Sequence, residues 1–273
     1  MRRRRRPSGL AIVSMIVLLL LYAPIAVVVV NSLNGDETLV GWGGFTTRWF
    51  GQAIHDSAVR NAFISSIEVA LLSTVISLAL AVTAALWARR ASQRARRFLD
   101  ATTYMRIILP ETVIALGLFL LLRREDVKLG VATIVIGHVV FNSAYATVVI
   151  QARMATLTET LEQAAADLGA TPWRVFRRVT LPLILPAVVV AGLLIFSFSF
   201  DDVVTSLFLG GSDVQTLPVL LLGLIRLHVT PEVNAIGVLV MLTTTGLLAF
   251  AAALTTVRGA VGARVAQTAP EEG

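Results

Sequence analysis

Residues Gln163 to Gly169 read Gln-Ala-Ala-Ala-Asp-Leu-Gly, and nine residues later Val179 to Pro182 read Val-Thr-Leu-Pro. Both stretches belong to a polar, helix-forming segment, 152–182, that lies between two long apolar runs. A chain this hydrophobic is expected to keep the loops between its helices short unless one of them has a function. The segment therefore predicts a surface on which another protein docks.

The composition is that of an integral membrane protein. Of the 273 residues, 56% are apolar and 15% are charged, and the mean hydropathy is +0.80. Soluble domains carry about 25% charged residues. The chain has no cysteine, which excludes disulfides, thiolate metal sites and a cysteine nucleophile. The net charge of +6 comes mainly from arginines at the ends of the apolar runs, which indicates membrane topology rather than nucleic-acid binding.

Six apolar runs are candidate membrane spans, which take about 20 residues, and the helix of the third is expected to begin a turn before its apolar run. Each is expected to be helical, because lipid offers no partner to backbone polar groups. The first run follows Arg2 to Arg6, but it is too long for a signal peptide and no small-x-small cleavage site follows it. We therefore expect an uncleaved first span. The expected spans are Leu10–Val30, Asn61–Trp87, Ile107–Leu122, Val131–Ile150, Leu183–Ser199 and Val233–Val257.

Positive charge predicts the orientation of these spans. With the N-terminus inside, the inner segments carry 17 of the 23 Lys and Arg residues. We therefore expect an all-α integral membrane protein with six transmembrane helices and both termini in the cytoplasm. The expected parts are a basic cytoplasmic N-terminus over 1–9, one transmembrane domain over 10–258 and a cytoplasmic tail over 259–273. Aromatic residues in the outer loop 31–60 predict an interfacial belt or, alternatively, a contact with an external partner.

Local signals divide the segment 152–182 into two short helices. Thr156-x-x-Glu159 predicts a capping box at the start of the first helix. Gly169 fits the left-handed position that ends a helix, and Thr171-Pro172 predicts the start of a second, amphipathic helix lying obliquely at the membrane surface. From the residues alone, docking to a partner protein and lying on anionic lipid remain alternatives.

The spacing in this segment resembles the EAA loop of ABC-importer permeases, Glu-Ala-Ala-x3-Gly-x9-Ile-x-Leu-Pro. Every spacing matches, while Gln163 replaces Glu and Val179 replaces Ile. The resemblance implies a type I importer permease fold whose short helix docks in a groove on a cytoplasmic ATPase. Gln163 removes a charge that could pair with the ATPase, and the adjacent Glu162 is a candidate to compensate. The coupling residues so implied are Glu162, Gln163, Ala164, Ala165, Asp167, Gly169, Arg174, Leu181 and Pro182.

Three other segments resemble the second permease subunit of spermidine/putrescine importers. They are the outer loop Trp42–Phe50, the Asp-Asp-Val-Val stretch Asp201–Val204, and Val229–Ala235 at the start of the last span. The resemblance implies a subunit of an ATP-driven importer of polyamines or related organic cations. An anion, amino acid or sugar is the alternative substrate for the same machine. A stand-alone secondary transporter would predict internal repeats, and none is clear.

The resemblance also implies partners and a location. The partners are a homologous second permease, two cytoplasmic ABC ATPase subunits, an extracytoplasmic solute-binding protein and membrane lipid, and the location is the bacterial cytoplasmic (inner) membrane. The sequence contains no Gly-x4-Gly-Lys-Ser/Thr phosphate loop, so we expect a non-enzymatic chain, with ATP and Mg²⁺ bound by the partner ATPase. We expect no cofactor or metal on this chain and no nucleic-acid partner.

A pathway for a multiply charged cation should offer carboxylates and aromatic faces. Ionisable residues within spans usually face the bundle interior or a water-filled cavity. Asp201 and Asp202 follow three phenylalanines, Phe196, Phe198 and Phe200, at the outer end of the fifth span, which predicts an acidic, aromatic mouth. The alternative is that these aspartates cap a short helix over 203–209. The substrate-pathway candidates are Asp201, Asp202, Glu111, Phe198, Phe200, Glu68 and His138.

Three of these candidates have alternatives of their own. Glu111 follows Pro110 and is expected at a kink, where a freed backbone group could be its partner. Glu68 could instead make a packing contact or a hydrogen bond to another subunit. His138 could be a core histidine whose hydrogen bonds are satisfied.

Overall fold

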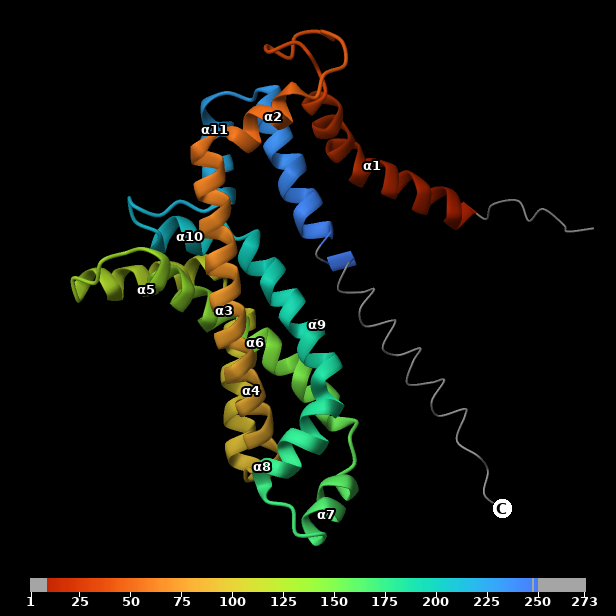
Figure 1. The fold of residues 1–273 in the computed structure, drawn as a ribbon, viewed down its shortest axis with the longest axis vertical. Helices are drawn as coiled ribbons and strands as arrows, with labels where there is room; N and C mark the ends of the chain where they lie inside the picture. The colour runs from red at the N-terminus through yellow and green to blue at the C-terminus, as the bar shows by residue number, and fades with distance from the viewer. Residues whose placement is uncertain (1–8, 247, 250–273) are drawn as a thin grey trace, which may run out of the picture. The chain divides into compact units, whose positions relative to one another are not determined.

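The computed structural model describes residues 9–246 and 248–249, and the regular structure of this part of the chain is helical (Figure 1). The expected termini over 1–9 and 259–273 lie outside the described residues, apart from Gly9. A further helix covers 231–246. The named helices are α1 (Gly9–Ser32), α2 (Arg48–His55), α3 (Ser57–Arg90), α4 (Gln93–Ile108), α5 (Glu111–Arg124), α6 (Val131–Ala155), α7 (Thr160–Asp167), α8 (Pro172–Val175), the π-helix η1 (Phe176–Thr180), α9 (Leu181–Phe200), α10 (Val204–Leu209) and α11 (Leu217–Leu227).

Four helices of the described residues are long and apolar enough to cross a membrane: Ala11–Ser32, Ser57–Arg90, Val131–Ala155 and Pro172–Phe200. They correspond to the expected first, second, fourth and fifth spans. The expected sixth span, Val233–Val257, begins inside the helix 231–246 and continues beyond the described residues.

The expected third span, Ile107–Leu122, is not one straight helix. Instead α4 and α5 meet at a 100° bend across Leu109 and Pro110 (Figure 1). Proline has no N–H to donate, and the residue before it avoids the helical conformation. Leu109 accordingly has extended backbone angles, with φ −64° and ψ 134°. Neither helix alone is long and apolar enough to span a membrane, but the two together are.

The bend also affects Arg106, one of the 17 basic residues that the orientation count placed in inner segments. Arg106 lies inside α4, where its guanidinium donates to Val140 O at 3.2 Å and to Ser143 Oγ at 2.9 Å on α6. An arginine within an apolar bundle needs such acceptors, because an unsatisfied charge there is costly. Charge counting alone could not place it.

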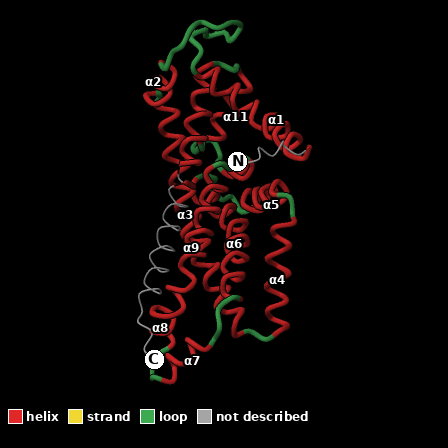
Figure 2. The backbone as a smooth tube through the Cα atoms, turned by 90° about the vertical axis from the view of Figure 1, so that its right-hand side faces the viewer, coloured by secondary structure: helices red, strands yellow, loops and turns green. Residues whose placement is uncertain are grey.

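The described chain forms two compact units. One consists of the described parts of 1–60 and 221–243, and the other of 61–220 and the described residues from 244 on. In the second unit α3, α6 and α9 lie side by side (Figure 2) and share a core of small and branched side chains. Small residues let helices approach closely in a membrane. The buried members of this core are Ala81, Ala85, Ala146, Ile150, Met154, Ile184, Ala191 and Ile195.

In the first unit the outer loop is ordered by side-chain hydrogen bonds. The side-chain amide of Asn34 donates to Gly41 O at 2.6 Å, and its oxygen accepts from Asp36 N and Gly43 N. Trp49, expected among the aromatic residues at the membrane boundary, is 6% exposed and donates to Asn34 O at 2.7 Å. Trp42 is exposed. The loop therefore has one buried aromatic anchor, Trp49, and two aromatic residues on its surface, Trp42 and Phe45.

Candidate functional site

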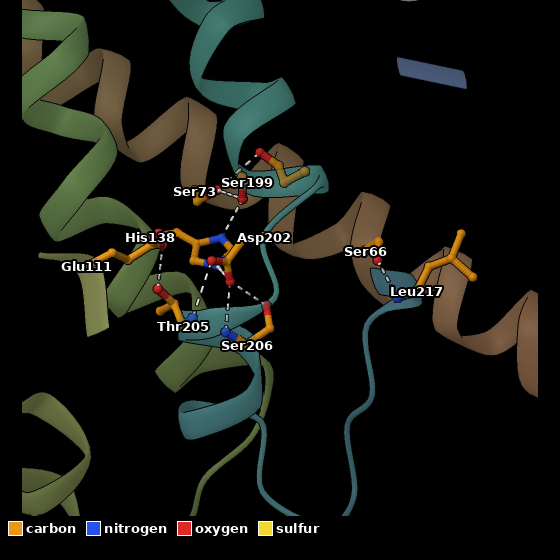
Figure 3. A network of polar contacts seen from close by, with 10 residues as sticks. Ser66, Ser73, Glu111, His138, Ser199, Asp202, Thr205, Ser206 and Leu217 are labelled. Atoms are coloured by element: carbon orange, nitrogen blue, oxygen red, sulfur yellow. Dashed lines mark hydrogen bonds and ion pairs between the residues drawn. The ribbon is translucent and has the colours of Figure 1, made fainter. Parts of the chain in front are cut away.

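The acidic pair after α9 lies near the level of the middle of α3 rather than near either end of that helix. Ser199, in the last turn of α9, has its Oγ 2.9 Å from Ser73 Oγ (Figure 3). Ser73 is near the midpoint of the 34-residue α3, about 25 Å from either end at 1.5 Å per residue. Asp201 and Asp202 thus follow a helix that ends level with the middle of α3. Carboxylates at such a depth face the bundle interior or water rather than lipid.

The Asp202 side chain is buried, and both of its carboxylate oxygens accept hydrogen bonds. Its Oδ1 accepts from Thr205 N at 3.3 Å, and its Oδ2 accepts from Ser206 N at 2.8 Å and from Ser206 Oγ at 3.0 Å (Figure 3). These bonds satisfy N–H groups in the first turn of α10, as a capping residue does. Asp202 has the capping geometry that was one of the two sequence-based alternatives.

His138 joins the same network from α6. Its Nε2 lies 3.0 Å from Asp202 Oδ2, and its Nδ1 is hydrogen-bonded to Ser199 Oγ. The ring is 3% exposed. With Nε2 donating to the carboxylate, a neutral ring accepts the Ser199 proton at Nδ1. One polar network therefore connects α3, α6, α9 and α10, and His138 has a satisfied partner on each ring nitrogen.

Glu111 reaches the network from the bend. It is the first residue of α5, and its Oε1 accepts from Thr205 Oγ1 at 3.0 Å. Its carboxyl also interacts with that of Asp202. Glu111 is half-buried, so a part of its carboxyl remains open beside α10. The kink predicted at Pro110 brings this carboxyl to the acidic pair.

Packing fixes α10 in this position. A Cβ at Gly137 of α6 would lie 2.5 Å from Thr205 Cγ2 and 2.6 Å from Leu209 Cδ1, so only glycine allows this approach. Beyond α10, Lys128 Nζ lies 2.9 Å from Asp213 Oδ2 in an exposed ion pair. The hydrogen bond from Lys128 lowers the pKa of the Asp213 carboxyl and raises the pKa of the Lys128 ammonium.

The remaining pathway candidates differ in accessibility. Asp201 is exposed and is hydrogen-bonded by Thr244. Phe198 is 39% exposed and meets Tyr145 edge to face, with 5.3 Å between ring centroids. Phe200 is 1% exposed and packs on other phenylalanines. It is therefore a core side chain. Glu68 is exposed on α3 and has no side-chain bond to any described residue.

The segment 152–182 contains the predicted helix end at Gly169. Gly169 has φ +79°, its N–H donates to Ala166 O at 2.9 Å, and Ala170 N–H donates to Ala165 O at 3.1 Å. This pair of bonds is the Schellman motif, which satisfies the last carbonyls of α7. The prediction of a glycine-terminated helix is confirmed.

Of two other local predictions for this segment, the capping box at Thr156 is wrong, and the helix predicted to start at Thr171-Pro172 does start there but is longer than expected. Thr156 ends α6, with its Oγ1 donating to Arg153 O at 2.7 Å, and α7 begins after Glu159 without a side-chain cap. The second short helix is not separate from the fifth span, because α8, η1 and α9 run on continuously from Pro172 to Phe200. The π turn lies just before Pro182, and Leu181 N–H donates to Phe176 O, five residues back. A proline that lacks an N–H disturbs the regular α ladder there.

The coupling candidates face in two directions. Gln163, Ala164, Asp167 and Arg174 are exposed, and Pro182 is exposed at the start of α9. Glu162 is turned inward, where its Oε1 lies 3.0 Å from Arg89 Nη1. The carboxylate that was to compensate for Gln163 therefore already has a partner within the chain.

Sequence reasoning missed Ser73, Ser199, Thr205 and Ser206, which complete the network, and Arg89 and Thr180, which hold Glu162. For Ser73 alone a sequence signal was present. Small polar residues at Ser66, Ser73 and Ser77 recur at helical spacing within α3, and all of them are buried.

Residues 77–266 match the sequence profile of the family described as "Binding-protein-dependent transport system inner membrane component". The chain belongs to this family. It is therefore a transmembrane permease subunit of the importer class and is not an enzyme, as the missing motifs predicted. The likeness to the ABC-importer permease family that the coupling segment indicated is confirmed.

Curated relatives of known name cover most of the chain. It is 34% identical over 228 residues to the putrescine transport system permease protein PotI of Escherichia coli (strain K12), covering 81% of each chain. It is 31% identical over 235 residues to the spermidine/putrescine transport system permease protein PotC of Haemophilus influenzae, covering 86% of this chain and 91% of that one.

Solved structures share the fold at low sequence identity. A chain of a bacterial ABC transporter involved in the import of the acidic polysaccharide alginate matches with a TM-score of 0.67 at 16% identity, covering 90% of this chain and 93% of that one. A chain of the MetNI methionine ABC transporter in inward-facing conformations matches with a TM-score of 0.61 at 15% identity, covering 73% and 94%. The helical importer-permease fold is thus shared with proteins whose named substrates differ widely.

Proposed function

We propose that this chain is one permease of an ATP-driven importer of polyamines or related organic cations. Six transmembrane helices with both termini in the cytoplasm would place it in the bacterial cytoplasmic membrane. One transmembrane domain would extend over 10–258, between the terminal segments 1–9 and 259–273. A homologous second permease would complete the pathway, two ABC ATPase subunits would bind at α7, and an extracytoplasmic solute-binding protein would deliver substrate.

The observation that carries the substrate class is the identity to two polyamine permeases over more than four-fifths of the chain. The chemistry of the site supports it. A polyamine carries at least two positive charges, which a carboxylate and an aromatic face both attract. Asp201 and Phe198 offer these groups at the end of α9, and both are accessible.

The proposed roles follow from accessibility. Asp201 and Phe198 contact the cation, and Glu111 and Glu68 offer further carboxylates along the pathway. Asp202 and His138 hold α10 in place, because their polar atoms are already bonded within the chain. ATP and Mg²⁺ would be bound by the ATPase subunits, whose closure would move α7 and switch the pathway from inward to outward access.

Replacing Asp201 with asparagine tests the cation contact. We expect the apparent affinity for putrescine uptake to fall about tenfold, since a hydrogen bond to a charged group contributes about 1.5–3 kcal/mol. The measurement is labelled putrescine uptake by the complete importer in proteoliposomes, with spermidine and a neutral solute as competitors. Asp126→Asn removes an exposed carboxylate elsewhere and should leave the kinetics unchanged. Unchanged kinetics for Asp201→Asn, or competition by the neutral solute alone, would contradict the proposed substrate.

A further inference from the structure

One carboxylate joins three parts of the cytoplasmic side. Glu162 of α7 accepts from Arg89 Nη1 at 3.0 Å and from Thr180 Oγ1 at 2.8 Å, both at Oε1. Arg89 lies in the last turn of α3, and its Nη2 also donates to Leu157 O at 3.0 Å. The docking helix is thus bonded to the inner end of α3 and to the turn that precedes α9.

This group is sheltered from water. The side chains of Arg89 and Glu162 are 17% and 24% exposed, and Thr180 is 3% exposed. They lie on the wall of a cavity of about 420 Å³ that Trp87 and Phe176 also line. Charge attraction is screened less in such a place than on an open surface. The planar guanidinium, bonded to a carboxylate and a carbonyl at once, also fixes the direction of the contact.

The docking helix needs this attachment. α7 has only 8 residues, and none of them is buried. An isolated helix of that length is not stable in water, so its position depends on contacts with the rest of the chain. Thr180 ends the π turn η1, from which α9 continues toward Ser199 and Asp201. A displacement of α7 would therefore reach both α3 and α9 through Glu162.

We infer that Arg89, Glu162 and Thr180 form a clasp that makes α7 move as one body with the inner ends of α3 and α9. Glu162 is a positioning residue of the coupling segment and does not replace the carboxylate missing at Gln163, which faces outward. The inference rests on the proposed function for what docks on α7. The clasp itself is a property of this chain.

Amide hydrogen exchange on the full-length chain in lipid nanodiscs tests the clasp without any partner. Arg89→Gln and Glu162→Gln should each accelerate exchange at Ala164 to Leu168 about three- to twentyfold, within the range of 0.5–2 kcal/mol for network couplings. The double variant should show no further acceleration, because both changes remove the same contact. Arg90 is an exposed arginine next to Arg89, and the control variant Arg90→Gln should show the same exchange rates in α7 as wild type. Unchanged exchange in α7 in both single variants would overturn the inference, and protection of α6 amides reports that each variant is folded.

Coupling is measured in the complete importer. Uptake per ATP hydrolysed should fall about three- to twentyfold in Arg89→Gln and Glu162→Gln while the ATPase subunits remain bound. The exchanged pair Arg89→Glu with Glu162→Arg should recover a part of this loss, since it restores opposite charges at the same positions. Wild-type coupling in variants whose α7 exchange is accelerated would overturn the positioning role. A wild-type chain that binds no ATPase would instead refute the proposed function, and the exchange experiment would still decide the clasp.

Discussion

Replacing Asp202 with alanine is expected to lower the free energy of unfolding by about 3–5 kcal/mol, because several buried donors lose a charged acceptor at once. The reason is the number of donors that this carboxylate satisfies. Thr205 N, Ser206 N and the Ser206 hydroxyl all donate to it, and His138 Nε2 lies 3.0 Å away. Each buried donor left without an acceptor adds a desolvation penalty. The measurement is equilibrium unfolding of the purified chain in mixed micelles.

The neighbouring aspartate provides the matched control. Asp201 is exposed and its hydrogen bond comes from Thr244 alone among the described residues, so Asp201→Ala should lower the unfolding free energy by about 1 kcal/mol or less. The loss of unfolding free energy in Asp202→Asn should lie between these two values. The amide oxygen can still accept hydrogen bonds, but the amide nitrogen is itself a donor and cannot accept from the donors around it. If Asp202→Ala unfolds like wild type but loses uptake, Asp202 contacts substrate and the structural role assigned to it is wrong.

The sequence was informative about length and local geometry. Apolar run length placed four spans, because the membrane demands a long apolar helix whatever its neighbours are. Gly169 was predicted correctly because a left-handed helix end depends on one residue and its immediate surroundings. The bend at Pro110 was anticipated as a kink, but its 100° angle depends on how α10 packs against α5 and α6.

The interior of the site could be predicted only in part. The acidic pair was identified as a candidate, but its depth depends on where α9 ends relative to α3, which no local pattern encodes. His138 and Asp202 are 64 residues apart, and Arg89 and Glu162 are 73 residues apart. Such pairs are formed by tertiary packing. Glu162 was consequently expected to face outward beside Gln163, whereas its side chain faces inward and contacts α3.

Replacing Gly169 with valine is expected to reduce ATP-driven uptake more than tenfold. The left-handed conformation costs an L-residue about 1–2 kcal/mol, and a β-branched side chain is particularly unsuited to it. At φ +79° the glycine ends α7 with both bonds of the Schellman motif, and valine would displace that end. Because α7 is short and unburied, a changed end alters the surface that we propose binds the ATPase. The measurement is uptake in proteoliposomes together with co-purification of the ATPase subunits.

Asparagine at the same position separates backbone conformation from side-chain bulk. A Cβ at Gly169 would meet no atom within 4 Å, so neither substitution is blocked by a neighbour. Asparagine adopts the left-handed region far more readily than valine does. Gly169→Asn should therefore keep uptake within about twofold of wild type, and Gly169→Ala should fall between them. Equal uptake by the valine and asparagine variants would mean that the left-handed turn is not needed for coupling, and the contact with the ATPase would then have to lie elsewhere along the segment.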